Sequence, residues 1–376
     1  MASVFGARVT GARLERMLAS PRYVDGTFRN TAVVEATTLL PPPAQRQGSA
    51  MAAMGEFFFG GARRTPPRPL PAEDPRATWQ RRAETGLRAT WLGHSTVLLE
   101  IDGVRVLTDP VWGERASPVG FAGPRRFQPV PVPIAELPPL DAVIVSHDHY
   151  DHLDHPSIVE LARRDVPFYT SLGVGAHLEA WGVRPERITE LDWWDEVRLP
   201  GTGLHITAAP SRHFSGRGLR RNATLWSSFA LRGPRHHVFF SGDTGLTPEY
   251  AEIAQRLGRF DLIMLEVGAF HPSWGDIHLG PENALTALEL LGGGSFLPVH
   301  WGTFNLAIHA WDDPAETLVH LAGPRGAHLV MPRLGAAVEP ERVETVEPWW
   351  RAVASETEAA APADAATAVP LGDPID

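Results

Sequence analysis

Short apolar runs separated by turn residues fill the chain from Arg88 onward. The stretch "RATWLGHSTVLLEIDGVRVLTDP" holds three such runs, broken first by Gly93-His94 and then by Asp102-Gly103. Because an Asp-Gly pair between apolar runs is typical of a two-residue β-hairpin, this stretch predicts antiparallel strands. Seven further runs predict strands, namely "DAVIVS", "LHITAAP", "LWSSFAL", "HHVFFSG", "DLIMLEV", "SFLPVHW" and "AHLVMP".

Helix-like segments alternate with the later strand candidates. The predicted helices span residues 155–164, 174–181, 248–257, 281–291 and 314–321. The last three open on a proline, whose fixed φ and missing N–H suit the first position of a helix. Hairpins followed by strand–helix alternation predict an α/β fold with mixed sheets.

The two ends of the chain differ in composition from this central part. Residues 1–87 are rich in Pro, Arg and Gly and show little periodicity. They predict an N-terminal arm ahead of a domain that spans residues 88–350. Residues 351–376 form a tail rich in Ala, Pro and acidic residues, and its lack of core-forming side chains predicts disorder.

The N-terminal arm carries a local positive charge. The first 90 residues contain 13 Arg and 7 acidic residues, and Phe57, Phe58 and Phe59 are followed closely by Arg63 and Arg64. Aromatic and basic side chains together are typical of contact with an anionic lipid surface. The alternative is that the three phenylalanines pin the arm to the domain core.

Composition also limits the partners and the location. A net charge of −10 argues against nucleic-acid binding. The chain has no run of 18 apolar residues, and Arg8, Arg13 and Arg16 interrupt its apolar N-terminus, so we expect neither a membrane-spanning helix nor a signal peptide. We therefore expect a cytoplasmic protein, with peripheral contact at the inner membrane surface as the alternative that the arm offers. The oligomeric state is left open, a homodimer being one option.

The segment "VIVSHDHYDHLD" concentrates side chains that bind metals. His147, His149, Asp151 and His152 directly follow the apolar run "AVIVS". The loop that follows a strand is where a rigid scaffold presents side chains to a cleft, so these residues predict a metal site. The alternative is a solvated, histidine-rich turn.

Three more residues of the same kinds follow other predicted strands, namely His213, Asp243 and His300. If those strands are neighbours in sheets, their ends meet at one edge and supply seven ligands. The chain contains no Cys, and Zn²⁺ accepts imidazole and carboxylate ligands together. Two metal ions about 3.5–4 Å apart suit a set of this size. We expect two Zn²⁺, with Mn²⁺ or Fe as alternatives.

The order of these motifs resembles the metallo-β-lactamase superfamily. The shared pattern is His-x-His-x-Asp-His, then a distant His, an Asp in "SGDTG" and a last His. Within that superfamily, "WLGHSTVLLE", "LTDPVWGERASPVGFAGPRRF", "ELPPLDAVIVSHDHYDHLD", "ELDWWDE", "FDLIMLEVGAF" and "PVHWGTF" resemble the branch of phospholipases D that hydrolyse N-acylphosphatidylethanolamine, close to ascorbate-6-phosphate lactonase-like proteins. The resemblance covers residues 80–305, with an echo in "DGTFRN". It implies a four-layer αββα sandwich with the metals at one edge, between two sheets.

The resemblance also implies roles for individual residues. It divides the ligands between two zinc ions, with His147, His149 and His213 on the first, Asp151, His152 and His300 on the second, and Asp243 bridging them. It further places a catalytic or substrate-orienting histidine at His278, for which the alternative is a loop residue without a role.

Five other residues are candidates for supporting or substrate contacts. Asp109 ends a strand and could accept the spare N–H of a metal-bound histidine, or it could simply open a turn. His94 lies near the site by the resemblance and is otherwise a turn residue. Arg217, Arg220 and Arg221 follow His213 in a glycine-containing loop, where their guanidinium groups suit a phosphate; the alternative is that they are solvated surface residues.

These features predict a dinuclear zinc-dependent hydrolase whose nucleophile is a metal-bridging hydroxide. The resemblance implies a phospholipase D-like phosphodiesterase that acts on N-acylphosphatidylethanolamine or a related phospholipid. A lactone or a small cyclic phosphate ester is the alternative substrate. Two rivals belong to other classes. One is a di-iron redox protein, whose relatives carry a carboxylate at the position of His149, and the other is a non-catalytic binding protein, which the complete ligand set argues against.

Overall fold

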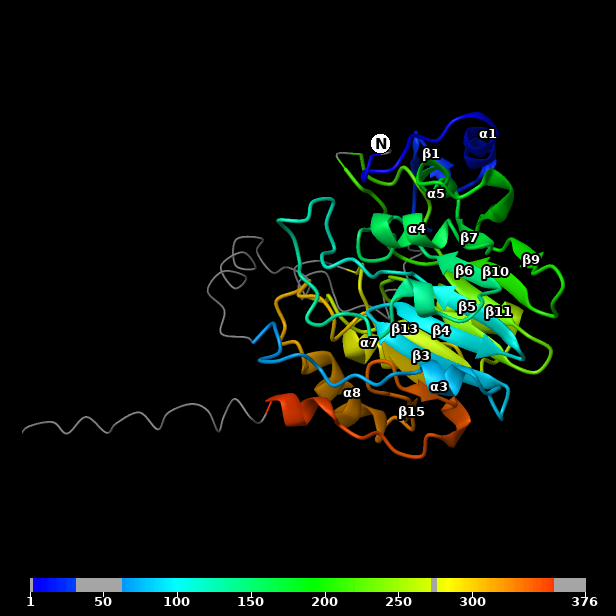
Figure 1. Ribbon diagram of the computed structural model, residues 1–376. Helices are drawn as coiled ribbons and strands as arrows, with labels where there is room; N and C mark the ends of the chain where they lie inside the picture. Colours follow the sequence, from blue (N-terminus) through cyan, green and yellow to red (C-terminus); the bar gives the residue numbers. More distant parts are fainter. Residues whose placement is uncertain (1–2, 32–62, 219, 272–275, 355–376) are drawn as a thin grey trace, which may run out of the picture.

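Two seven-stranded mixed sheets pack face to face in the computed structural model, which describes residues 3–31, 63–218, 220–271 and 276–354 (Figure 1). The first sheet has the order β16-β3-β4-β5-β6-β7-β8, with strands at Ala337–Val338, Leu87–Gly93, Thr96–Ile101, Val104–Thr108, Ala142–Val145, Phe168–Ser171 and Ile188–Leu191. The second has the order β15-β14-β13-β12-β11-β10-β9, with strands at His328–Leu329, Ser295–Val299, Leu262–Glu266, His237–Phe240, Ser228–Arg232, His205–Ala209 and Glu196–Arg198.

Helices cover the outer face of each sheet. On the first sheet lie α4 (His155–Leu161) and α5 (Gly175–Ala180), and a hydrophobic cluster joins Ile158 and Leu178 to strand residues such as Leu107. On the second lie α6 (Glu249–Leu257), α7 (Gly280–Leu290) and α8 (Asp313–Ala322). These layers confirm the expected αββα sandwich.

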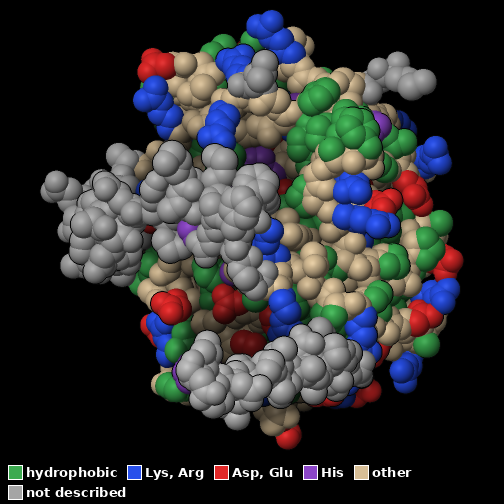
Figure 2. Space-filling view, turned by 90° about the vertical axis from the view of Figure 1, so that its left-hand side faces the viewer, with side chains coloured by type: hydrophobic (Ala, Val, Ile, Leu, Met, Phe, Trp, Pro, Cys, Tyr) green, Lys and Arg blue, Asp and Glu red, His purple; other side chains and the backbone are tan. Residues whose placement is uncertain are grey.

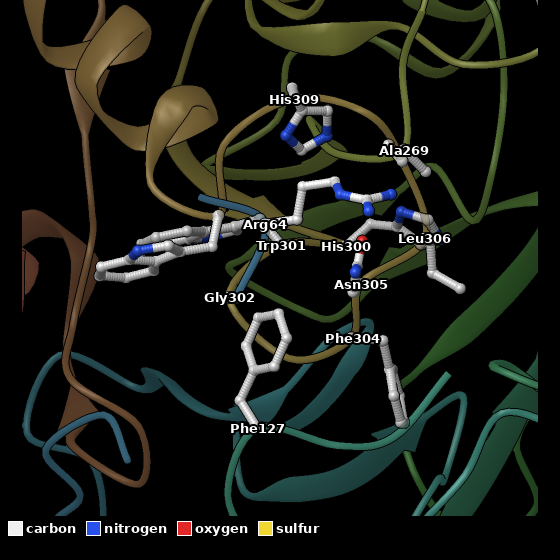
Figure 3. A pocket seen from close by; sticks show the side chains of 12 residues that line it. Arg64, Phe127, Ala269, His300, Trp301, Gly302, Phe304, Asn305, Leu306 and His309 are labelled. Atoms are coloured by element: carbon white, nitrogen blue, oxygen red, sulfur yellow. The ribbon is translucent and has the colours of Figure 1, made fainter. Parts of the chain in front are cut away.

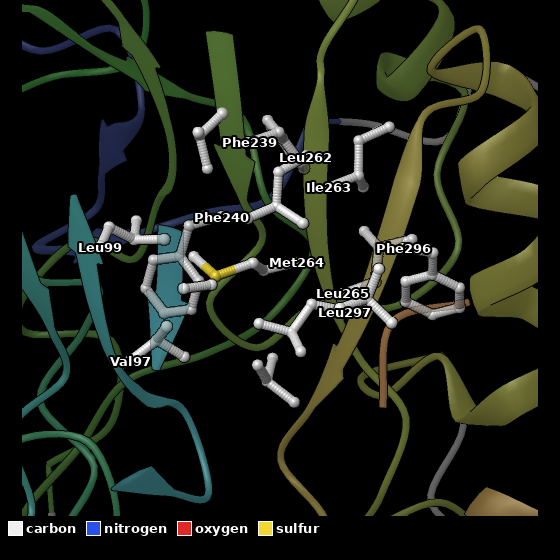
Figure 4. Close-up of a cluster of buried hydrophobic side chains, with 14 of the residues drawn as sticks. Val97, Leu99, Phe239, Phe240, Leu262, Ile263, Met264, Leu265, Phe296 and Leu297 are labelled. Carbon is white, nitrogen blue, oxygen red and sulfur yellow. The ribbon is translucent and has the colours of Figure 1, made fainter. Parts of the chain in front are cut away.

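The main core fills the space between the sheets. Figure 4 shows Val97 and Leu99 of β4 facing Phe240 of β12 and Met264 of β13, and all four are fully buried. Alternate residues of β6 face opposite sides of the first sheet: Ala142 and Ile144 belong to the cluster between the sheets, whereas Val143 and Val145 belong to the cluster under α4 and α5. The sandwich is therefore apolar on both faces of its central strands.

The hairpin predicted at Asp102-Gly103 is confirmed. β4 and β5 pair antiparallel with Ile101 opposite Val104, and both turn residues have positive φ, 53° at Asp102 and 91° at Gly103. A type I′ turn needs this pair of conformations, which explains the Asp-Gly sequence. All ten predicted strand regions contain a strand and all five predicted helices are present, within a few residues. Of the strands in the two sheets, β7, β8, β9 and β16 were not predicted.

The described part of the predicted arm packs on the domain. Residues 3–31 include α1 (Gly11–Ala19) and a hairpin of β1 (Tyr23–Val24) and β2 (Thr27–Phe28). Met17 and Phe28 are buried in a third cluster whose remaining buried members are Leu172, Trp193, Leu225 and Trp226. A short helix, α3 (Arg76–Trp79), adds Trp79 to the cluster under α4 and α5.

Some predictions concern the ends of the chain. Phe57, Phe58 and Phe59 lie outside the described residues, as do residues 355–376 of the predicted tail. Val353, which the sequence assigned to the tail, is buried in the main core. Within the described ranges, no helix has both the length and the apolar character needed to cross a bilayer.

Candidate metal centre

The carboxyl ends of parallel strands from both sheets meet at one edge of the sandwich. In the first sheet β5 runs parallel to β6, and Asp109 and His147 follow their ends. In the second sheet β12, β13 and β14 are parallel, and Asp243 and His300 follow β12 and β14. This edge is the usual place for a ligand site in α/β sheets. Figure 2 shows histidine side chains in a hollow of the face that it presents.

The first group of converging side chains is His147, His149, His213 and Asp243. His149 Nδ1 lies 2.9 Å from His147 Nε2 and 3.2 Å from His213 Nε2. Asp243 Oδ2 lies 3.9 Å from the same nitrogen of His147 and 3.7 Å from that of His213. Four ligands about 2.0–2.2 Å from a tetrahedral ion are separated by roughly 3.3–3.5 Å, so these spacings suit one metal ion.

Hydrogen bonds on the far side of two rings fix the tautomers that a metal requires. Ser146 Oγ donates to Asp109 Oδ2 at 2.6 Å, so the contact of 2.9 Å between Ser146 Oγ and His147 Nδ1 has the ring N–H as donor. His213 Nδ1 donates to the carbonyl oxygen of Ile277 at 2.8 Å. The Nε2 atoms of both histidines are therefore left with lone pairs that face the site.

The second group contains Asp151, His152 and His300, with His94 added by the structure. Asp151 Oδ2 lies 3.2 Å from His300 Nε2, 3.6 Å from His152 Nε2 and 3.0 Å from His94 Nε2. The sequence placed His94 only near the site, and the structure brings its ring onto the carboxylate of Asp151. The ring of His94 also packs against that of His300, with centroids 4.0 Å apart and the planes tilted by 42°.

Asp243 belongs to the first group and also lies against two residues of the second. Its Oδ2 is 3.1 Å from His300 Nε2 and its Oδ1 is 3.1 Å from His152 Nε2. The contact with His152 lacks hydrogen-bond geometry, and both atoms are buried without a hydrogen-bond partner in the described structure. Buried polar atoms without partners are costly, and a divalent cation between them would satisfy both. The residues present therefore fit two metal ions that share one carboxylate.

Asp109 supports the second group, as the sequence suggested for it. Its Oδ2 accepts from His152 Nδ1 at 2.6 Å, and its Oδ1 accepts from the backbone N–H of Ser146 at 2.7 Å. Asp109 is fully buried, and burial raises its pKa even though His152 and Ser146 act in the opposite direction. The carboxylate orients His152 and, through the hydroxyl of Ser146, also His147.

The protonation preferences of the two groups differ. Burial lowers the pKa of His147 and of His213 well below the usual value, which keeps both imidazoles neutral. Burial also opposes charge on His300, but the carboxylates of Asp243 and Asp151 outweigh it and raise its pKa to about 10. Asp243 has its pKa held well below normal by His152 and His300 despite its burial. The two carboxylates therefore favour the protonated form of His300, the opposite of the preference at His147 and His213.

Backbone strain is concentrated at this edge. His94, Asp109 and His300 have positive φ values of 54°, 32° and 64°, a region that residues other than glycine rarely adopt. Next to them, a Cβ added to Gly268 would lie 2.0 Å from the carbonyl oxygen of His300, so only glycine fits there. Strain of this kind persists where the surrounding structure imposes it, and it is common at functional sites.

His278 lies where the resemblance implied. Its ring is 5.1 Å from that of His213 and 5.3 Å from that of His300, measured between centroids. Glu266, at the end of β13, was not predicted: its Oε1 lies 3.4 Å from His278 Nδ1 and accepts from the backbone N–H of Leu279 at 2.5 Å. The sequence did contain a pattern that could have indicated Glu266, namely an acidic residue at the end of the apolar run "DLIMLEV". An acidic residue near the end of a strand is also what indicated Asp243.

The three arginines after His213 require a correction. Arg217 is buried, and its guanidinium donates to the carbonyl oxygens of Asp148 and Leu153, both at 2.7 Å, and of Val4 at 2.9 Å. Its donors are thus used within the protein, so both suggestions for this residue, a phosphate contact and a solvated surface position, are wrong. Arg220 is exposed and donates to the carbonyl oxygen of Gly26.

Arg221 lies near the site but is separated from it by Phe214. It is exposed, and its guanidinium lies 4.8 Å from the ring of Phe214. Phe214 in turn packs against the ring of His149 at 4.5 Å. Arg221 therefore contacts the site through an aromatic side chain and makes no direct contact with the ligand groups.

Comparisons with known proteins show the family to which the chain belongs. Residues 104–301 match the model of a family described as a beta-lactamase superfamily domain. An uncharacterized protein of Mycobacterium tuberculosis is 44% identical over 336 residues, which is 88% of each chain. The N-acyl-phosphatidylethanolamine-hydrolyzing phospholipase D 1 of Caenorhabditis elegans is 38% identical over 255 residues, covering 65% of this chain and 72% of that protein.

A solved structure supports the fold. The isothiocyanate hydrolase from Delia radicum gut bacteria superimposes with a TM-score of 0.54 at 23% identity, over 67% of this chain and 98% of that one. The sandwich and its edge of histidines and aspartates define a metal-dependent hydrolase. The chain belongs to the metallo-β-lactamase superfamily, as its motifs indicated.

Replacing Asp243 tests the assignment of a shared ligand. Asp243→Ala removes a ligand from both groups, so we expect zinc affinity at both sites to fall by more than the roughly 10–100-fold typical of residues that only orient a ligand. Zinc content after dialysis would be measured by atomic emission. Asp165→Ala is the matched control, because its carboxylate is 91% exposed. Two tightly bound zinc ions in Asp243→Ala would contradict the assignment.

Proposed function

We propose that this protein is a dinuclear zinc phosphodiesterase of the phospholipase D type, acting on N-acylphosphatidylethanolamine or a related phospholipid. The observation that carries the proposal is that two ligand groups lie against one carboxylate, that of Asp243. Imidazole and carboxylate ligands without thiols favour zinc among the candidate ions. When bound, such a pair of ions supplies hydroxide at neutral pH and stabilises charge on a phosphoryl group.

The surroundings of the site favour a substrate with an anionic group. A cavity lies against His300 and is lined by Arg64, Phe127, Phe304 and His309, among others (Figure 3). A guanidinium group suits the geometry of a phosphate, so Arg64 favours an anionic group beside His300. The name of the relative from Caenorhabditis elegans points to the same substrate class.

His278 is the group we assign to the leaving oxygen. Its side chain is 13% exposed, and the Nδ1 edge of its ring faces Glu266 at 3.4 Å. The Nε2 edge is then available to a substrate oxygen between the rings of His213 and His300. An imidazole so placed can take part in one proton transfer during bond cleavage.

A substrate panel tests the proposed function. The zinc-loaded protein would be assayed with N-acylphosphatidylethanolamine in mixed micelles, with bis(p-nitrophenyl) phosphate and with a set of lactones, and Asp243→Ala would serve as the inactive control. We expect release of phosphatidic acid from the phospholipid and loss of that activity on chelation. Turnover of lactones with neither phosphodiester cleaved would contradict the proposal and favour the lactonase alternative.

His278→Ala separates catalysis from metal binding. If His278 acts on the leaving group, kcat should fall by about 10²–10⁴-fold, the range typical for proton transfer by a positioned side chain, with zinc content near two per chain. His320→Ala is the control, since His320 is exposed in the last turn of α8. An unchanged kcat on the substrate that the panel identifies would show that His278 has no catalytic role.

A further inference from the structure

His213 lies in a long loop, so its position has to be fixed by contacts with other segments of the chain. The loop spans residues 210–227, between the end of β10 and the start of β11. Its first residues are tied to the segment that carries Asp243: Ser211 Oγ donates to the carbonyl oxygen of Asp243 at 2.7 Å, and the N–H of Arg212 donates to Thr244 Oγ1 at 3.0 Å. These two bonds hold the loop on its Asp243 side.

The backbone of His213 itself is held by a residue near the start of the chain. Asn30 Nδ2 donates to the carbonyl oxygen of His213 at 2.9 Å, and the N–H of His213 donates to Asn30 Oδ1 at 3.1 Å. The same Oδ1 accepts from Trp226 Nε1 at 3.1 Å. One side-chain amide thus binds both polar backbone groups of His213 and fixes the peptide units on either side of it.

The position of Asn30 is itself fixed by packing. Phe28, two residues earlier, is 0% exposed in the cluster with Met17 and Trp226. The N–H of Phe28 donates to the carbonyl oxygen of Asn222 at 2.9 Å. Since Asn222 belongs to the same long loop as His213, the β1–β2 hairpin holds that loop at two separate points.

The ring of His213 completes the arrangement. Its Nδ1 donates to the carbonyl oxygen of Ile277, and its Nε2 faces the first ligand group. We propose that Asn30 is a positioning residue for His213, so that the N-terminal hairpin sets the affinity of the first metal site. The proposal rests on the two-metal centre proposed above. In the described part of the chain, the hydrogen bonds of the Asn30 side chain reach His213 and Trp226, and none reaches the second ligand group.

Two substitutions in the full-length protein test the proposal. Asn30→Ala removes every bond of the amide. Asn30→Asp has the same shape and still accepts from His213 and Trp226, but it cannot donate to the carbonyl oxygen of His213. Arg29→Ala is the matched control, because Arg29 is on the same hairpin, has a side chain that is 54% exposed and pairs with Asp25. Zinc would be titrated against a chromophoric chelator to obtain both affinities.

The expected result is selective. The native protein and Arg29→Ala should bind two zinc ions, whereas in both Asn30 variants one affinity should fall by about 10–100-fold and the other should stay unchanged. Native affinities at both sites would overturn the proposal. So would equal losses at both sites with a lower melting temperature of the metal-free protein, since that result indicates a merely structural role. A native protein that binds one zinc would refute the two-metal centre instead, and the Asn30 variants would then be judged by that single affinity.

Discussion

The buried carboxylate of Asp243 is the interaction on which the rest of this edge depends. Its side chain is 2% exposed, and an ionised carboxylate in that position costs several kcal/mol unless opposite charge or hydrogen bonds compensate it. His152 and His300 lie 3.1 Å from its two oxygens, and His147 and His213 complete the surroundings at 3.7–3.9 Å. Because two of these histidines come from each sheet, the carboxylate ties the two halves of the sandwich together where the metals would bind.

Much of this arrangement could be predicted from the sequence, because it follows from where strands end. The residues after "AVIVS", "VFFSG" and "FLPV" stand at the carboxyl ends of strands that form two sheets, and such ends meet at one edge. The hairpin at Asp102-Gly103 was predictable for a similarly local reason, since its turn needs positive φ at both residues. Family motifs supplied the four-layer arrangement, which the strand and helix pattern alone did not determine.

The parts that were missed depend on contacts between distant segments. The loop sequence around Arg217 resembles a solvated basic loop, and nothing in it reveals that the carbonyl oxygens of Val4, Asp148 and Leu153 take up its donors. Asn30 is separated from His213 by 183 residues, so its role has no local pattern. Glu266 did carry a local signal, an acid at the end of an apolar strand, and it was missed because its neighbours lack the histidine-rich motif.

Anomalous diffraction from crystals of the zinc-loaded protein tests the central claim most directly, since it locates each metal without reference to activity. We predict two zinc peaks about 3.5–4 Å apart, the spacing typical of two-metal sites, with the carboxylate of Asp243 between them. His147, His149 and His213 should surround one peak, and Asp151, His152 and His300 the other. A single peak, or two peaks that do not share Asp243, would contradict the account.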